Sequence, residues 1–224
     1  LRGAVAQSTG GMAAMHAARE PQLLATASLL MAMWWTMMTA MMLPSAAPAI
    51  LLYGRIRARH GARAGIVPSW LFLAGYLSAW LVISVLATMV QMVATATGLL
   101  DGMAMRVTAP PLASALLIAA GLYQLTPVKN ICLANCRSPA SFLANHWQPG
   151  VAGALRLGLL HCAYCVGCCW LLMAMLFVGG VMNMLWITAL AALVAAEKLA
   201  PLRLRLSRLT GVLLIIAGTV RLLL

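Results

Sequence analysis

Long apolar stretches dominate the chain, and short basic segments separate them. Each stretch is long enough, at about twenty residues, to form an α-helix that crosses a hydrocarbon core about 30 Å thick. The apolar runs are continuous, whereas the strands of a membrane barrel would alternate apolar and polar residues. The pattern therefore predicts an all-α, polytopic transmembrane helical bundle. The six spans that we expect cover residues 23–53, 67–97, 111–128, 151–178, 181–200 and 206–223.

Proline and glycine mark the expected interruptions. Pro44 and Pro48 should kink or break the first span, because proline lacks the backbone N–H that a helix interior requires. Gly179 and Gly180 predict a tight corner between the fourth and fifth spans, and Pro201 should close the fifth. No boundary between globular units is visible, so we expect an external N-terminal segment, 1–21, followed by one transmembrane domain, 22–224.

Charge predicts the orientation. Most of the 15 Lys and Arg residues fall in the first, third and fifth connections, and such an excess marks the cytoplasmic side of a membrane. Both termini should then be external or periplasmic, in a bacterial inner membrane. The net charge of +12 also favours anionic lipid as a partner. The basic residues are scattered over loops, so we expect no nucleic-acid binding.

The strongest chemical signal is a cluster of cysteines beside a histidine in the fourth span. On a helix with about 100° per residue, the five side chains fall within a sector about 120° wide. The segment 157–196 around them has no charged residue. Buried thiols can be simple apolar packing, but soft ligands concentrated at membrane depth favour a metal or redox site. The candidate ligands are His161, Cys162, Cys165, Cys168 and Cys169.

Two further cysteines, Cys132 and Cys136, lie in the predicted cytoplasmic loop between Pro127 and Pro139. Their spacing suits a short ordered turn with a two-thiolate metal or redox pair. A structural disulfide is disfavoured in the reducing cytosol. The alternative is a pair of unrelated loop thiols.

Methionine is the third signal, with 16 residues in the chain. In the first span Met31, Met38 and Met42 share one helix face. Thioethers select Cu(I), although methionine is also flexible core filler. Further methionines in the N-terminal segment, Met12 and Met15 with His16 beside them, and near the external ends of spans four and five extend a possible ladder of soft ligands.

The mixture of thiol, thioether and imidazole favours Cu(I), with zinc or an iron–sulfur cluster less favoured. A tetrathiolate zinc site would carry two negative charges, and Arg156 lies on the opposite helix face. Glu197 and Lys198 end the fifth span. They form either a proton or cation relay or an interfacial ion pair that reaches the cytoplasmic surface.

Several segments together carry a resemblance: MWWTMMTAMMLPSAAP, LYQLTPVKNICLANCRSP, HCAYCVGCCWLLM, FVGGVMN and AAEKLAP. The combination resembles a bacterial family of predicted metal-binding integral membrane proteins, described as a domain of unknown function. The resemblance implies an inner-membrane helical protein with a metal site, copper handling and small periplasmic partners. The residues that it marks are the segment 31–44, Cys132, Cys136, His161, Cys162, Cys165, Cys168, Cys169, Asn183 and Glu197.

Three functions remain open. The first is Cu(I) handling, by relay, transport or delivery to a partner enzyme. The second is a thiol–disulfide redox protein that uses Cys132, Cys136 and the membrane cysteines. The third is a non-catalytic accessory subunit of a larger membrane complex, and a homo-oligomer is possible. With three acidic residues in all and no nucleotide-binding glycine motif, the sequence does not favour an enzyme.

Overall fold

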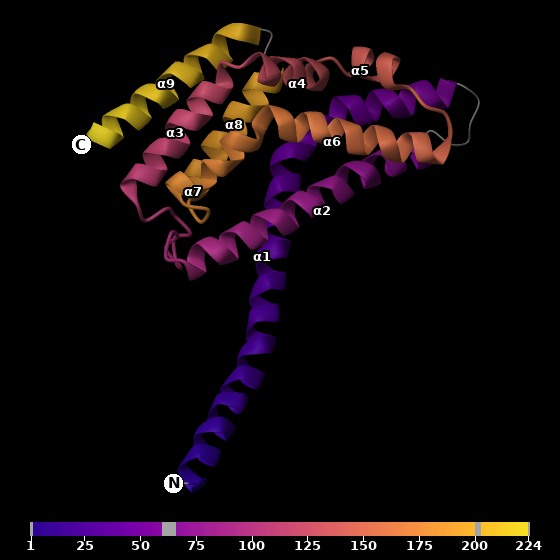
Figure 1. The fold of residues 1–224 in the computed structure, drawn as a ribbon. Coiled ribbons are helices and arrows are strands. Elements are labelled where there is room, and N and C mark those ends of the chain that lie inside the picture. Colours follow the sequence, from indigo (N-terminus) through magenta and orange to yellow (C-terminus); the bar gives the residue numbers. More distant parts are fainter. Residues whose placement is uncertain (1, 60–65, 200–202, 224) are drawn as a thin grey trace.

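The computed structural model describes residues 2–59, 66–199 and 203–223, with side chains for 21–59, 69–199 and 206–223. All the named elements in this part of the chain are helices, and it has no β-strand, which confirms the all-α prediction. The helices are α1 (Arg2–Arg59), α2 (Ile66–Ala96), α3 (Pro110–Gln124), α4 (Pro127–Arg137), α5 (Pro139–His146), α6 (Gly150–Ala174), α7 (Leu176–Gly179), α8 (Met184–Leu199) and α9 (Arg203–Leu223) (Figure 1).

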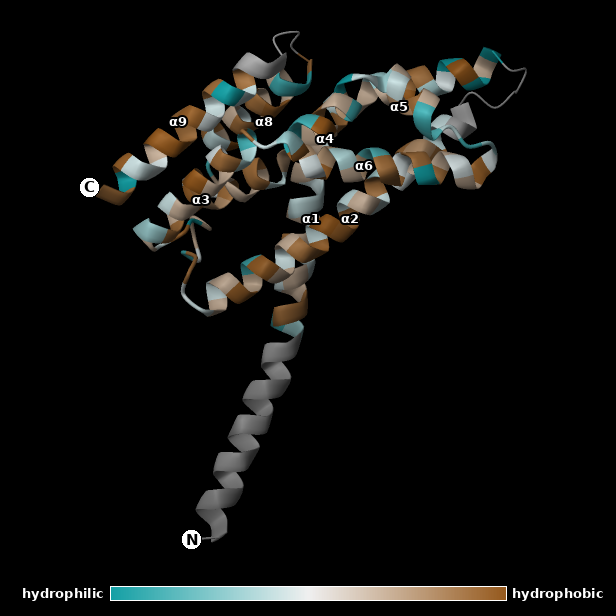
Figure 2. Ribbon diagram, turned by 45° about the horizontal axis from the view of Figure 1, so that its top comes forward, coloured by the Kyte–Doolittle hydropathy of each residue, from teal (hydrophilic) through white to brown (hydrophobic). Residues whose placement is uncertain are grey.

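Four segments of these helices are long and apolar enough to cross a membrane: Pro21–Arg59, Ser69–Ala96, Gly150–Gly179 and Leu206–Leu223. The number is five if α3 and α4, which meet at a 66° bend, form one broken span. The fifth predicted span corresponds to α8, whose 16 residues are fewer than a straight crossing requires. Apolar residues cover much of the outer surface of α2 and α9 (Figure 2), including the exposed Val82, Val93, Leu213 and Ile216.

The first span is kinked and not broken. Helix α1 is continuous although Pro21, Pro44 and Pro48 lie inside it, and it changes direction in its second half (Figure 1). A proline removes one backbone hydrogen bond and crowds the preceding turn, which bends a helix when neighbouring helices hold both halves. The bend brings the second half of α1 against α2 and α5, and Met42 lies just before Pro44 on the buried side.

The predicted loop that carries Cys132 and Cys136 is wrong, because these residues lie in a helix. Helix α3 ends at Gln124, and α4 begins at Pro127. Proline disfavours a helical conformation in the residue before it, so Thr126 is extended and caps α4 by accepting a bond from the Lys129 N–H. The bend turns α4 back onto α6, which it contacts extensively.

Helices α2 and α6 pack closely because glycine leaves room for the facing backbone. A Cβ on Gly158 would overlap the carbonyl oxygen of Phe72, and a Cβ on Gly75 would overlap that of Leu155. Small residues allow such close approach between helices in a membrane. The contact fixes the height of the cysteine face of α6 relative to Tyr76 of α2.

Substitution of Gly158 by alanine should therefore destabilise the fold. The added methyl group meets backbone, which cannot rotate away, and overpacking of this kind costs about 1–3 kcal/mol. The matched control is Gly102→Ala, since a Cβ on Gly102 meets nothing within 4 Å. Thermal unfolding in detergent should show a lower midpoint for G158A alone. Equal midpoints for the two variants would contradict the close approach.

A buried ion pair joins α4 to α8. The Nζ atom of Lys129 lies 2.6 Å from an Oε atom of Glu197, and the two side chains are 0% and 2% exposed. The Glu197 carboxylate also accepts bonds from Gln124 at 3.0 Å and from Ser207 and Thr210 at 3.3 Å. The interpretation of Glu197 and Lys198 as an ion pair at the membrane surface was wrong, because Glu197 pairs with Lys129 inside the protein. A buried charge of this kind persists only with such partners.

Candidate metal centre

The four cysteines of α6 belong to the larger of the two buried apolar clusters of the described residues. Cys162, Cys165, Cys168 and Cys169 are each 1% exposed. The thiols of Cys168 and Cys169 both donate to the carbonyl oxygen of Cys165, at 3.0 and 2.9 Å. These residues share a face because they recur at three- and four-residue intervals on a helix. The face is turned toward α1, α2, α4 and α8, into the interior of the protein.

Met42 of α1 meets this face. Its Sδ atom lies 3.9 Å from the Sγ atoms of both Cys165 and Cys169. The three sulfur atoms come from two helices and form a compact group of soft donors. Of the other two predicted methionines, Met38 is buried one turn away, and Met31 is half-buried and outside the core cluster.

A lysine lies among these sulfur atoms. The Nζ atom of Lys198 is 2.9 Å from Cys165 Sγ, 3.5 Å from Met42 Sδ and 3.2 Å from Ser45 Oγ. Its side chain is buried, so the surface position predicted for it is wrong. The assumption that no cation stands near the cysteines is wrong for the same reason. The one hint in the sequence was that Lys198 lies at the end of an apolar helix beside Glu197. The direction in which its side chain points is decided by the packing of the helices.

Helix α4 brings the remaining two cysteines to α6. Cys136 is 7% exposed, and its thiol lies beside that of Cys168. The Sγ atom of Cys132 lies 2.8 Å from the position that a Cβ on Gly167 would take, on a different side of α6 from Met42. All six cysteines are free thiols. Sequence spacing suggested one pair, Cys132 and Cys136, whereas the structure brings Cys136 into contact with α6.

His161 is enclosed by aromatic rings. Its ring centroid lies 5.0 Å from that of Phe142, 5.9 Å from that of Phe72 and 6.0 Å from that of Tyr76. The side chain is 2% exposed, and its buried Nδ1 atom has no hydrogen-bond partner. A buried polar atom without a partner costs free energy, so it marks a position where a ligand could bind.

In the described part of the chain, no three side chains of His, Cys, Asp or Glu are arranged to hold a metal ion as they stand. The donors that the fold does gather are two thiols and one thioether, with a lysine beside them. This set suits a soft ion of low coordination number and does not suit tetrahedral zinc or calcium. The assignment of individual ligands remains a prediction.

Comparison with known proteins identifies the family. A family model described as PpoB2, copper chaperone, matches residues 31–221. The chain belongs to this family. The match includes α1 from Met31, both helices that carry cysteines, and Lys198. It confirms that the family suggested by the sequence motifs is related to copper. The search of curated proteins and the search of solved structures gave no match.

Proposed function

We propose that the protein is a membrane-embedded copper chaperone that holds Cu(I) between Cys165, Cys169 and Met42 and passes it to a protein partner. The observation that carries this proposal is the position of Met42 Sδ, 3.9 Å from both thiols. Thiolate and thioether donors favour Cu(I) over harder ions. Membership of a copper chaperone family supports the same ion as cargo.

Electrostatics supports this donor set. Cu(I) bound by two thiolates carries one negative charge, which is costly to bury in a membrane protein. The Lys198 ammonium, 2.9 Å from Cys165 Sγ, supplies the opposite charge. The loaded centre would then be neutral overall, whereas a zinc tetrathiolate would keep a net negative charge beside a single lysine.

The neighbouring soft donors give the cargo a path out of the centre. Cys168 follows Cys165 on the same face and lies beside Cys136 of α4. Cys132, one turn earlier on α4, is half-buried. Exchange of Cu(I) from one sulfur to the next would move it toward a partner protein without free ion. Cys162 and His161 extend the donor set on the opposite side.

The proposal includes location. The four or five candidate spans, with α8 as a further short crossing, support an inner-membrane protein in a lipid bilayer. The basic connections support a topology with both termini external. Arg221, near the end of α9, lines a cavity with Asp101 and Arg106 of the α2–α3 connection, which is consistent with an external position for both.

Replacement of Met42 by leucine tests the centre. Leucine keeps the volume and removes the thioether that lies 3.9 Å from both thiols. The affinity for Cu(I) should therefore fall by at least the roughly 10- to 100-fold that is typical when a residue supporting a metal site is lost. Competition with a coloured Cu(I) chelator measures this. The matched control is Met41→Leu, because Met41 packs against the core but bonds to neither thiol. Wild-type affinity in M42L, or no copper in the purified wild-type protein, would contradict the proposal.

The Cys136–Cys168 contact favours one alternative, a thiol–disulfide protein. Oxidation of this pair would form one S–S bond and pass two electrons and two protons to a membrane quinone. Thiol labelling after quinone treatment distinguishes the two functions, because only the redox protein loses exactly these two labels. An accessory subunit would instead co-purify with a stoichiometric partner after copper is removed.

A further inference from the structure

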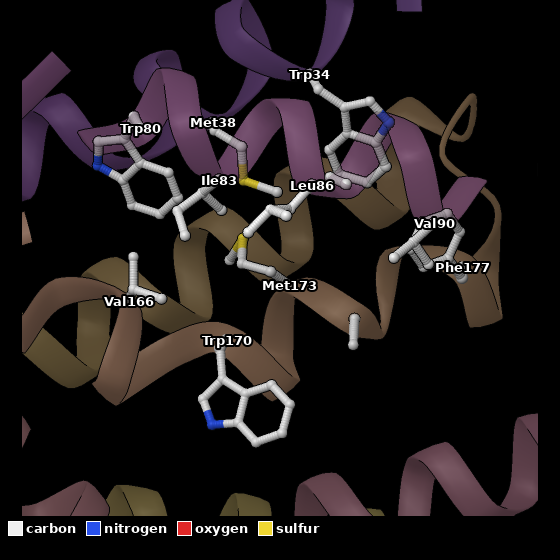
Figure 3. A pocket seen from close by; sticks show the side chains of 12 residues that line it. Trp34, Met38, Trp80, Ile83, Leu86, Val90, Val166, Trp170, Met173 and Phe177 are labelled. Carbon is white, nitrogen blue, oxygen red and sulfur yellow. The ribbon is translucent and has the colours of Figure 1, made fainter. Parts of the chain in front are cut away.

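A cavity of about 450 Å³ lies between α1, α2, α6 and α7. Its walls carry no charged side chain (Figure 3). The volume is within the range of ligand-binding sites, and the candidate centre described above does not use it. The residues that line it are Trp34, Met38, Trp80, Ile83, Leu86, Ala87, Val90, Val166, Trp170, Met173, Ala174 and Phe177.

The lining is apolar, yet it contains two kinds of group that attract a soft cation. Met38 of α1 and Met173 of α6 contribute thioether sulfur atoms, which bind Cu(I) as neutral ligands. Trp34, Trp80 and Trp170 contribute indole rings, whose faces attract cations. A hard ion such as Na⁺ or Mg²⁺ would find no oxygen ligand here.

One end of the cavity adjoins the candidate metal centre. The ring of Trp80 stands edge-on to that of Tyr76, with centroids 6.3 Å apart. The hydroxyl group of Tyr76 lies 3.4 Å from Cys165 Sγ and 3.3 Å from the carbonyl oxygen of Met42. Met38 is one helical turn before Met42 on the same buried face of α1. The cavity is therefore separated from the thiols by the Tyr76–Trp80 pair and by one turn of helix.

The other end adjoins the α2–α3 connection, residues 97–109. The indole N–H of Trp34 donates to Gln91 at 2.5 Å, and the amide of Gln91 donates to the Sδ atom of Met105 at 2.9 Å. The N–H of Val107 donates to the carbonyl oxygen of Phe177 at 2.8 Å. Met105 has φ +48°, a left-handed conformation that costs energy in a residue other than glycine. The fold holds this thioether in place at the end of the cavity.

Exposed thioethers lie on the two segments next to this end. The carbonyl oxygen of Ala104 lies 3.0 Å from the position of a Cβ on Gly180, so the connection packs on the α7–α8 corner. Met103, Met182 and Met184 are 89%, 52% and 75% exposed on these two segments. Soft ions are the ligands that thioether sulfur prefers, and these exposed sulfur atoms are accessible to them.

We propose that this cavity is the route by which Cu(I) enters the protein, with Met38 and Met173 as intermediate ligands between the exposed methionines and the thiol centre. The inference rests on the proposed function, since it assumes that Cu(I) is the cargo. Each step is ligand exchange. A new Cu–S(thioether) bond forms as the previous one breaks, copper stays in the +1 state, and no proton or electron is transferred. The indole rings offset part of the cost of a monovalent cation in an apolar cavity.

The rate of loading tests the route. The full-length protein in lipid nanodiscs is mixed with a coloured Cu(I)–bicinchoninate complex, and loss of colour is followed by stopped flow. In the double variant Met38→Leu, Met173→Leu the cavity keeps its volume and loses both sulfur atoms. We expect the same final amount of bound copper and a loading rate lower by about tenfold or more. The matched control Met37→Leu, Met41→Leu removes two core methionines that do not line the cavity, and should load at the wild-type rate.

A third variant, Ala87→Phe, fills the cavity from α2 without removing sulfur, and should also slow loading. Three outcomes overturn the route. In the first, the Met38/Met173 variant loads at the wild-type rate, as expected if an acyl chain occupies the cavity. In the second, A87F loads at the wild-type rate, so that filling the cavity does not hinder copper. In the third, the Met37/Met41 control slows as much as the Met38/Met173 variant. Failure of the wild-type protein to bind copper at equilibrium would instead refute the proposed function, so the two failures are distinguishable.

Discussion

A protein in which Cys165 and Cys169 are both replaced by serine is expected to lose its high-affinity Cu(I) site. Both thiols lie 3.9 Å from Met42 Sδ, and serine offers a hard oxygen that binds Cu(I) poorly. Loss of two direct ligands should exceed the 10- to 100-fold effect typical of a supporting residue, so affinity should fall by more than about 100-fold. Copper analysis after dialysis against a chelator would measure the loss.

The control is Cys132→Ser. Its Sγ atom faces Gly167 and not Met42, so this variant should keep the high-affinity site while delivery to a partner slows. The thermal midpoints of both variants show whether the fold survives. If the double variant retains wild-type copper, the ion is bound elsewhere and the proposed centre is wrong. If C132S loses as much copper as the double variant, the centre extends onto α4.

The second large effect is expected at Glu197. Substitution by glutamine leaves the Lys129 ammonium, which is 0% exposed, without its carboxylate. Removal of one partner of a buried ion pair typically costs about 3–5 kcal/mol. Since the pair joins α4 to α8, we expect a lower unfolding midpoint and faster labelling of Cys136 by maleimide as α4 separates from α6.

Two controls distinguish the loss of the buried ion pair from the loss of a carboxylate elsewhere in the protein. Asp101→Asn removes a carboxylate at an exposed position and should change stability by less than about 1 kcal/mol. The double variant Lys129→Met, Glu197→Gln removes both charges and should recover part of the stability lost in E197Q. If E197Q unfolds at the wild-type midpoint, the ion pair does not hold α4 in place.

Periodicity was sufficient for much of the fold. Helices α2, α6 and α9 begin and end within a few residues of the predicted spans, because an apolar run of the right length has few alternatives. The corner at Gly180 is also correct, and its φ of +93° explains why glycine stands there. The burial of Cys165 and Cys169 follows from the same helical spacing.

Local signals left two outcomes open at α1 and misled at α4. Pro44 and Pro48 were compatible with a break or a kink, and only packing against α2 and α5 holds the two halves as one helix. Pro127 was taken as the start of a loop, although proline is also favoured in the first turn of a helix. Proline can therefore interrupt a helix or begin one, and the packing of neighbouring segments decides which of the two occurs.

The sequence by itself determined the helical class, the apolar spans and the soft-ligand face of α6, since each depends on residues that are close in the chain. The tertiary structure decided which residues meet that face. Met42 and Lys198 are 156 positions apart and contact the same thiol, and Lys129 neutralises Glu197 across 68 positions. Such contacts depend on the bend at Pro127, the close approach at Gly158 and the packing of α8, and no local pattern encodes a distance between segments that far apart.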